Sequence, residues 1–138
     1  MTTTKEITIT ATSGTNKAQI SVDGNEIGFG NYSTGINLAV FEETTGKPLF
    51  STNFARCKYQ GYTVIPEAFA DLIDTRPEGR IVAVAVKGDP GYATAIAKAA
   101  FKSIGSSDID QLPYGGQLIA LVGIKGHDQG TAHESISW

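Results

Sequence analysis

The stretch Leu112-Pro-Tyr-Gly-Gly-Gln-Leu-Ile-Ala-Leu-Val-Gly-Ile-Lys-Gly126 opens with a turn and runs into an almost unbroken apolar segment. Apolar and small residues in a row, bounded by glycines, predict a strand that is buried on both faces. A second stretch, Arg80-Ile-Val-Ala-Val-Ala-Val-Lys87, has the same character. We therefore expect these two strands to form the centre of a sheet that the rest of the chain covers.

Length and composition predict one domain over residues 1–138. The chain has 138 residues, of which 41% are hydrophobic and 18% charged, so it can bury a real core. The net charge is −3 and the 11 Lys and Arg residues are scattered, which argues against nucleic acid as a main partner. No apolar run approaches the roughly 20 residues of a membrane-spanning helix, so we expect no membrane span.

The single cysteine and the N-terminal residues bear on the cellular compartment of the protein but do not identify it. Cys57 is the single cysteine, so an internal disulfide and a thiolate metal site are excluded. Its neighbours Arg56 and Lys58 leave open both an inert thiol and a reactive one. Met1 to Glu6 contain no apolar segment typical of a secretory signal. This predicts cytoplasmic synthesis, leaves assembly into a virion or on a surface open, and does not identify the compartment.

The first half of the chain has the alternation of β-strands. Two alternating segments separated by Ser13-Gly14-Thr15-Asn16 predict a hairpin. Pro48 lacks a backbone N–H, so we place it at a strand start or on a sheet edge. The strands expected here are 5–11, 17–23, 35–42 and 47–54, with a glycine-rich aromatic loop at 28–35 and a polar aromatic loop at 56–62.

The second half alternates helices with the two apolar strands. Pro66 suits a first helical turn, and the spacing of apolar residues predicts a helix from Pro66 to Thr75. Asp89 and Pro90 predict the start of a second helix, with Asp89 as its cap. The apolar face of that helix is expected to consist of Ala93, Ile96, Ala97, Ala100, Phe101 and Ile104, before a stop at Gly105. A loop at 106–111 and a last edge strand within 131–138 complete the chain.

Residues suited to catalysis are sparse. No serine lies in a Gly-x-Ser-x-Gly turn, and the two histidines, His127 and His133, fall in a polar C-terminal segment. They fit exposed surface residues, and a general base would need an oriented partner. Together with Asp128 and Glu134 they could in principle surround a metal ion, but the spacing of these four residues matches no known metal-binding motif. We therefore expect no catalytic residues, no metal and no cofactor.

Ligand-binding candidates lie in the loops. Tyr114, Gly115 and Gly116 precede a central strand, where glycines allow close backbone approach and an aromatic face can stack on a sugar ring. They would also serve simply as a turn. Asp89 is open to both helix capping and a ligand contact, and the glycine-rich loop lacks the following helix that a phosphate site needs. The candidate ligand-binding residues are Tyr32, Asp89, Tyr114, Gly115, Gly116 and Gln117.

Several segments, in their order, resemble the interleukin-like EMT inducer/PANDER-like domain family. The match extends over about residues 5 to 137. The segments that carry it are Gly35-Ile-Asn-Leu-Ala-Val-Phe, Thr45-Gly-Lys-Pro-Leu-Phe, Phe54, Pro77-Glu-Gly-Arg-Ile-Val-Ala-Val-Ala-Val, Asp89-Pro90, Ala100-Phe-Lys-Ser-Ile-Gly-Ser-Ser, Val122-Gly-Ile-Lys-Gly126 and Gly130-Thr-Ala-His-Glu134.

The resemblance implies an α+β fold, a β-β-α sandwich of two mainly antiparallel sheets with two helices packed against them. It also implies a non-enzymatic module. Members include secreted cytokine-like proteins and the sugar-binding stem domain of a protein O-mannose glycosyltransferase. The four cysteines of the cytokine-like members are absent here, consistent with a microbial or phage relative.

The sugar site of that stem domain does not transfer intact. Its loop carries an Arg-Asp pair and a Trp where this chain has Gly115, Gly116 and Leu118. Thr34 stands where the family often has Arg, and Gly88 replaces an acidic residue beside the matching Asp89.

The sequence favours a non-catalytic, lectin-like module that binds a glycan, with N-acetylhexosamine as the candidate sugar, in a surface or virion assembly. The alternative is a structural or protein-interaction accessory protein of a phage particle or cell surface, which binds other proteins and no sugar. The oligomeric state is left open.

Overall fold

The computed structural model describes residues 7–27, 34–55, 57–59, 61–88, 93–111 and 118–137. Its strands are β1 (Ile9–Thr12), β2 (Gln19–Val22), β3 (Asn25–Glu26), β4 (Gly35–Phe41), β5 (Pro48–Phe54), β6 (Cys57–Tyr59), β7 (Tyr62–Val64), β8 (Ile81–Lys87), β9 (Leu118–Ile124) and β10 (His133–Ser137). Its helices are α1 (Glu67–Asp74), α2 (Ala95–Ser103) and the short 3-10 helix η1 (Asp108–Gln111).

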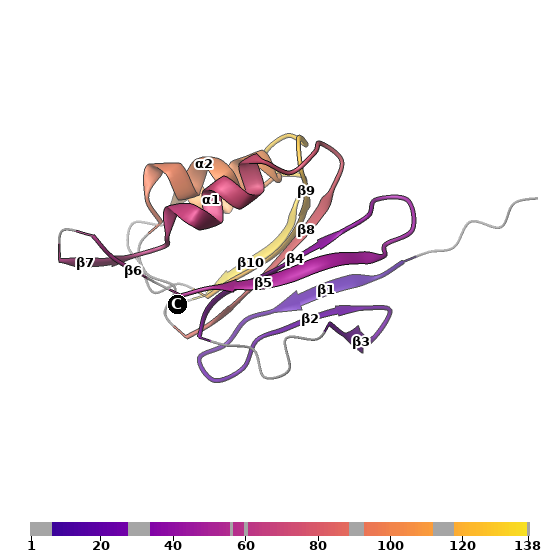
Figure 1. Cartoon of the computed structure of the whole chain (residues 1–138), viewed down its shortest axis with the longest axis horizontal. Coiled ribbons are helices and arrows are strands. Elements are labelled where there is room, and N and C mark those ends of the chain that lie inside the picture. Colours follow the sequence, from indigo (N-terminus) through magenta and orange to yellow (C-terminus); the bar gives the residue numbers. More distant parts are fainter. Residues whose placement is uncertain are drawn as a thin grey trace, which may run out of the picture.

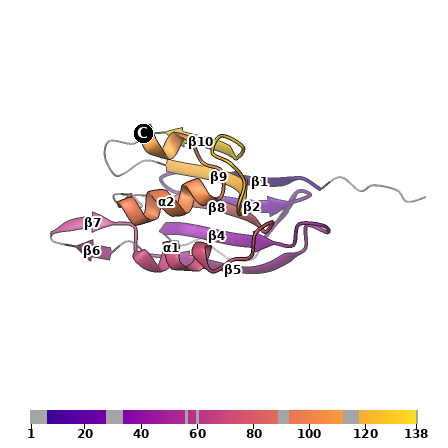
Figure 2. The same ribbon diagram turned by 90° about the horizontal axis from the view of Figure 1, so that it is seen from above.

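The elements form three layers. A five-stranded sheet in the order β10-β9-β8-β4-β5 lies between a three-stranded sheet, β1-β2-β3, and the helices α1 and α2 (Figure 1). Every strand pair within these sheets is antiparallel. Seen from above, α1 and α2 lie side by side over the five-stranded sheet (Figure 2). The expected α+β class, with two antiparallel sheets and two packed helices, is confirmed.

The two apolar stretches lie together near the centre of the larger sheet. β8 pairs with both β4 and β9, and Val84 lies opposite Leu121. Both side chains are fully buried, as predicted. The expectation of burial on both faces is confirmed for β8 but not for all of β9, where Val122 and Ile124 are half-buried.

Successive residues of β8 supply two different cores, because side chains alternate between the faces of a sheet. Val82, Val84 and Val86 pack against the helices, while Ala83 and Ala85 pack against the three-stranded sheet. On the helical side an aromatic cluster joins three elements. The Phe69 ring of α1 lies 4.9 Å from the Phe101 ring of α2. It also meets Phe54 of β5 edge to face, at 5.8 Å between centroids.

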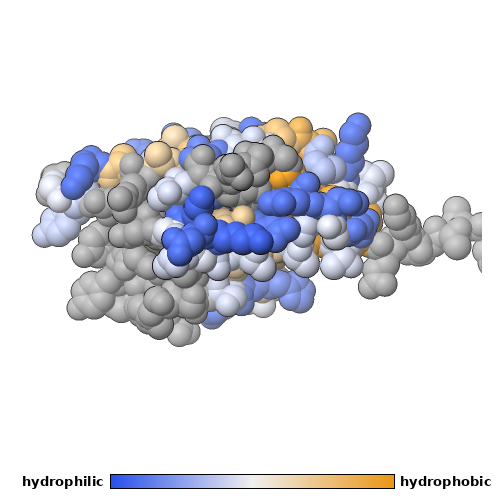
Figure 3. All heavy atoms as spheres, turned by 90° about the horizontal axis from the view of Figure 1, so that it is seen from below, coloured by the Kyte–Doolittle hydropathy of each residue, from blue (hydrophilic) through white to orange (hydrophobic). Residues whose placement is uncertain are grey.

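The outer face of the three-stranded sheet is polar. In this sheet Ile20 faces inward and is fully buried. Thr10 and Ser21 lie opposite each other, and their hydroxyl oxygens are 2.6 Å apart. Among the atoms that are coloured in the view from below, hydrophilic colours are the most extensive and orange atoms gather mainly toward one edge (Figure 3). The predicted hairpin of β1 and β2 is confirmed, and this hairpin forms one outer layer of the molecule.

The start of the second helix was predicted wrongly. α2 begins at Ala95, and Thr94 is its N-cap, with the hydroxyl oxygen accepting a hydrogen bond from the Ala97 N–H at 3.2 Å. Asp89 therefore does not cap this helix. Ile96 was expected on the buried face, but it is 49% exposed because it lies in the first turn, beyond the edge of the core.

The first helix and the end of the second match expectation. α1 follows Pro66 and buries Phe69, Ala70 and Ile73. Gly105 has φ +98°, a conformation that favours glycine, and it follows the C-cap Ile104. Gly123 of β9 lies directly beneath that cap, and a Cβ there would overlap the carbonyl oxygen of Ile104. The end of α2 thus depends on a glycine in the central sheet.

Two connections differ from the sequence interpretation. Residues 56–62 were expected to form a loop, but Cys57–Tyr59 and Tyr62–Val64 pair as an antiparallel hairpin. Residues 106–111 were also expected to form a loop, and they contain η1. Pro48 begins β5, an edge strand, as predicted. No helix among the described residues is long and apolar enough to span a membrane.

We predict that Leu121→Ala lowers the free energy of unfolding by about 2–5 kcal/mol, because it leaves a cavity between the sheet and the helices. Leu49→Ala is the matched control, since Leu49 is 44% exposed on the edge strand β5. Urea denaturation of both variants measures the difference. An equal loss in the two variants would contradict the assigned core.

Candidate functional site

Three neighbouring strands terminate at one end of the five-stranded sheet. Gly35, the first residue of β4, pairs with Lys87, the last residue of β8. Since Ala85 pairs with Ala120, the antiparallel register brings Leu118, the first residue of β9, level with Lys87. Neighbouring strands are about 4.8 Å apart, so these three strand ends lie within about 10 Å.

Every predicted ligand-binding residue belongs to a segment attached near this end. Residues 28–33 precede β4, residues 89–92 follow β8, and residues 112–117 precede β9. The candidate residues Tyr32, Asp89, Tyr114, Gly115, Gly116 and Gln117 lie in these segments, outside the described residues. The strand topology therefore brings together the attachment points of all three segments, which the sequence alone did not reveal.

The hydroxyl of Ser13 joins β8 and β9 at this end. Beyond the pair Ala85–Ala120, the Val86 N–H donates to Ser13 Oγ at 2.8 Å. Ser13 Oγ in turn donates to the Ile119 carbonyl oxygen at 2.6 Å. The serine hydroxyl thus connects two backbone groups at the level where the ladder between β8 and β9 ends. The sequence marked Ser13 only as a turn residue.

Gly14 extends the same attachment. Its N–H donates to the Val86 carbonyl oxygen at 3.1 Å, and its own carbonyl oxygen accepts from the Gly88 N–H at 2.9 Å. Gly14 forms an isolated parallel bridge with Lys87. The turn between β1 and β2 is therefore hydrogen-bonded directly to the end of β8, so the hairpin and the strand end are held as one unit.

Two asparagines add a buried polar pair near the start of β4. Asn37 is fully buried, and its Oδ1 accepts from Asn53 Nδ2 at 3.0 Å. Asn37 Nδ2 donates to the Ala85 carbonyl oxygen at 3.3 Å. No buried side-chain nitrogen or oxygen of the described residues lacks a hydrogen-bond partner. The buried polar groups beneath the strand ends are thus engaged in positioning the backbone.

The C-terminal histidines do not gather with their acidic neighbours. His133 and Glu134 are consecutive in β10, so their side chains point to opposite faces of the sheet. The Glu134 carboxylate accepts from the backbone N–H groups of Ser107 and Asp108, at 2.9 and 3.0 Å, and from the Ser106 hydroxyl at 2.6 Å. Within the described ranges no group of three or more His, Cys, Asp and Glu side chains is placed to hold a metal ion.

Cys57 lies in the β6-β7 hairpin, and it is exposed. The hairpin and the first turn of α2 border a hollow of about 410 Å³, lined in part by Cys57, Val64 and Ile96. Lys58 and Glu67 also line this hollow, and the described residues place no metal-binding group of three or more His, Cys, Asp and Glu side chains around the thiol.

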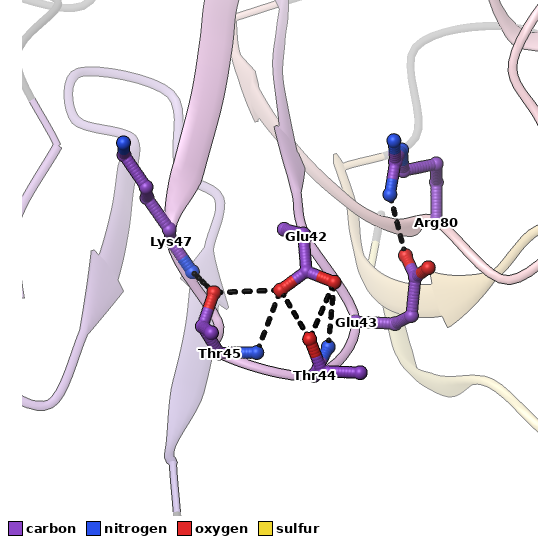
Figure 4. Close-up of polar contacts among 6 residues, drawn as sticks. All are labelled: Glu42, Glu43, Thr44, Thr45, Lys47 and Arg80. Carbon is purple, nitrogen blue, oxygen red and sulfur yellow. Dashed lines mark hydrogen bonds and ion pairs between the residues drawn. The ribbon is translucent and has the colours of Figure 1, made fainter.

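The opposite end of the sheet carries the clearest electrostatic feature. Glu42 follows β4, and its carboxylate accepts hydrogen bonds from the hydroxyl and N–H groups of Thr44 and Thr45, at 2.6–3.1 Å (Figure 4). The Thr44 and Thr45 hydroxyls, followed by the two N–H groups, lower the pKa of Glu42 to about 2. Next to it, Glu43 forms an ion pair with Arg80 at 2.8 Å.

A lowered carboxylate pKa often marks a functional site. Here the hydrogen bonds all come from the turn that joins β4 to β5, and they favour the charged carboxylate in its folded position. The turn lies at the end of the sheet remote from the converging strand ends. We therefore assign Glu42 to the stability of this turn.

The sequence of this region matches a known protein family. The family model described as Interleukin-like EMT inducer matches residues 34–127, which is more than half of the chain. The matched region begins one residue before β4 and includes both helices, β8 and β9. It ends at His127, three residues after the end of β9. A search of curated proteins found no match.

We predict that Ser13→Ala lowers the free energy of unfolding by about 1–3 kcal/mol, because it leaves the Val86 N–H and the Ile119 carbonyl oxygen without their bridging partner. Ser13→Thr keeps the hydroxyl and is expected to recover part of this loss. Amide hydrogen exchange at Val86 provides the local readout. Unchanged exchange at Val86 in Ser13→Ala would contradict the bridging role.

For Glu42→Gln we predict a loss of stability at neutral pH that shrinks on acidification. Because the folded-state pKa is lowered, the stabilisation by Glu42 is fully present above the unfolded value of 4.5 and is lost as the pH falls through about 2. Urea denaturation of both proteins between pH 7 and pH 2 measures the difference. Glu26→Gln, on exposed β3, is the charge-matched control. A difference for Glu42→Gln that stays constant over this range would contradict the account.

Proposed function

This chain belongs to the interleukin-like EMT inducer family, and we propose that it is a non-catalytic, lectin-like module that binds a glycan at the converging ends of β4, β8 and β9. The observation that carries the proposal is the register of these strands. It attaches the three segments with the candidate residues to one end of the sheet. A sugar needs aromatic faces, polar side chains and close backbone approach in one place.

The residue types of the three segments fit this requirement. Tyr32 and Tyr114 supply aromatic rings that can stack on the apolar face of a pyranose. Asp89 and Gln117 supply hydrogen-bonding groups for sugar hydroxyls and for an acetamido group. Gly115 and Gly116 allow the backbone itself to approach the ligand.

The family resemblance supports the ligand class. The sugar-binding stem domain of the resembling glycosyltransferase uses the loop that corresponds to residues 114–118. This chain has Gly115 and Gly116 in place of the charged pair, so recognition here rests on stacking and on hydrogen bonds from residues such as Asp89 and Gln117. We propose glycans with N-acetylhexosamine as the ligand, presented to a module of a surface or virion assembly.

We predict that Tyr114→Ala weakens glycan binding at least tenfold, because the proposed stacking on sugar goes with the ring, and that it leaves the melting temperature close to that of the unmodified chain. Tyr62→Ala is the matched control. Tyr62 is 63% exposed on β7, outside the three segments. A glycan array, followed by competition with a β-linked N-acetylhexosamine, measures binding.

Two outcomes would contradict this proposal. One is the absence of binding to any glycan below millimolar concentration, by the chain and by its oligomers. The other is equal glycan affinity in Tyr114→Ala and the unmodified protein.

A protein-interaction role is the second candidate function. The observation that favours it is the incomplete cover of β9 by the three-stranded sheet, where Val122 and Ile124 are half-buried. Co-purification of the chain with a particle would support a structural accessory role.

A further inference from the structure

The sheet face that packs on β1 is covered unevenly. In β8, Ala83 and Ala85 are fully buried beneath the three-stranded sheet. In β9, Val122 on the same face is only half-buried, because no strand lies beyond β1 among the described residues. Apolar surface of the central sheet is therefore open to solvent beside β1.

Two adjoining hollows occupy this uncovered surface. Their volumes are about 460 and 370 Å³, and Ile9, Val122 and His133 line both. One wall is the edge of β1, the floor is the lower face of β9, and β10 forms the far side. We call the two hollows together the β1 groove. Beyond Thr12, the last residue of β1, Ser13 and Gly14 form hydrogen bonds to β8 and β9.

The wall of the β1 groove carries free backbone groups. The Asp23 N–H donates to the Thr8 carbonyl oxygen at 2.7 Å. Bonded and non-bonded residues alternate along an antiparallel pair, so Thr8, Thr10 and Thr12 point their backbone groups toward β2. The N–H and C=O groups of Ile9 and Ala11 then point away from β2, toward the groove.

This edge lacks the features that normally prevent strand pairing. β1 reads Ile-Thr-Ala-Thr, with no charge, proline or glycine. The other edge strands of the two larger sheets differ: β5 begins with Pro48, β10 begins with His133 and Glu134, and β3 has 2 residues. An uncharged edge with unpaired backbone groups is a template for another strand.

We propose that the β1 groove binds a single extended peptide segment of a partner protein, which adds to β1 as an antiparallel or parallel strand. Main-chain hydrogen bonds to Ile9 and Ala11 would hold the segment. Alternate side chains would face the floor at Ala120 and Val122, which selects small or β-branched apolar residues. This inference concerns a different surface from the proposed glycan site.

The histidines of the groove add a second criterion for the partner. His133 faces the groove, whereas the Glu134 carboxylate lies on the other face and is bound to Ser107 and Asp108. His127 lines the far end. Among the described residues, the ionisable side chains on the groove side are thus histidines, whose ring nitrogens offer hydrogen bonds to a polar residue of the peptide.

A second copy of the chain fits this groove poorly. Pairing β1 with β1 would join strands of 4 residues each. A stable dimer buries about 800 Å² per partner, far more than such a short ladder supplies. The second copy would also bring its own five-stranded sheet against β10. A lone strand meets neither obstacle.

The test is a display library of random dodecapeptides selected on the full chain. Enriched peptides are expected to alternate apolar residues and to bind at least tenfold more weakly to two variants. Ala11→Pro removes an outward N–H without breaking a bond to β2. Ser135→Arg fills the groove from exposed β10. Asn25→Arg, on exposed β3, is the matched control and is expected to bind normally.

Fluorescence anisotropy gives the affinities, and circular dichroism verifies that each variant is folded. The inference is overturned if no peptide is enriched, or if enriched peptides bind Ser135→Arg as tightly as the unmodified chain. It is also overturned if light scattering shows a dimer that Ala11→Pro dissociates, because a second copy would then occupy the groove. Binding that appears only after deletion of residues 1–6 would assign the groove to that segment instead.

Discussion

The structure depends on β8 being buried on both faces by different layers. Its valines, such as Val84, face the helices, and its alanines, Ala83 and Ala85, face the three-stranded sheet. Small side chains on one face let β1 approach the central sheet closely, while branched side chains on the other fill the space beneath α1 and α2. The alternation of large and small residues in one strand therefore sets the spacing of all three layers.

That packing explains which parts of the fold the sequence could predict. Apolar runs and alternation located the strands of both sheets except the two-residue β3, and the apolar spacing after Pro66 located α1. The start of α2 was misplaced because Asp89 and Pro90 have the local features of a helix start, yet Thr94 provides the cap that the structure uses. The β6-β7 hairpin was missed because its strands are 3 residues long and have little alternation.

The candidate site was predictable only in part. The residue types were enough to single out Tyr32, Asp89 and the segment 114–117. They could not indicate that these segments attach to neighbouring strand ends, because the order of strands in a sheet depends on long-range pairing. The Ser13 bridge to Ile119 spans 106 residues of sequence, so no local pattern could indicate it. The β1 groove is equally invisible in sequence, since it results from one sheet being narrower than the other.

The proposed glycan site lies at the end of the sheet where β4, β8 and β9 terminate. The most direct test is a titration of the ¹⁵N-labelled chain with methyl β-N-acetylglucosaminide, followed through its backbone amide signals. We predict shifts that concentrate at Gly14, Gly35 and Gly88, which surround the strand ends, and none at Gly46 in the opposite turn. Signals that stay fixed throughout the titration, or that move at Gly46 and not at Gly35, would contradict it.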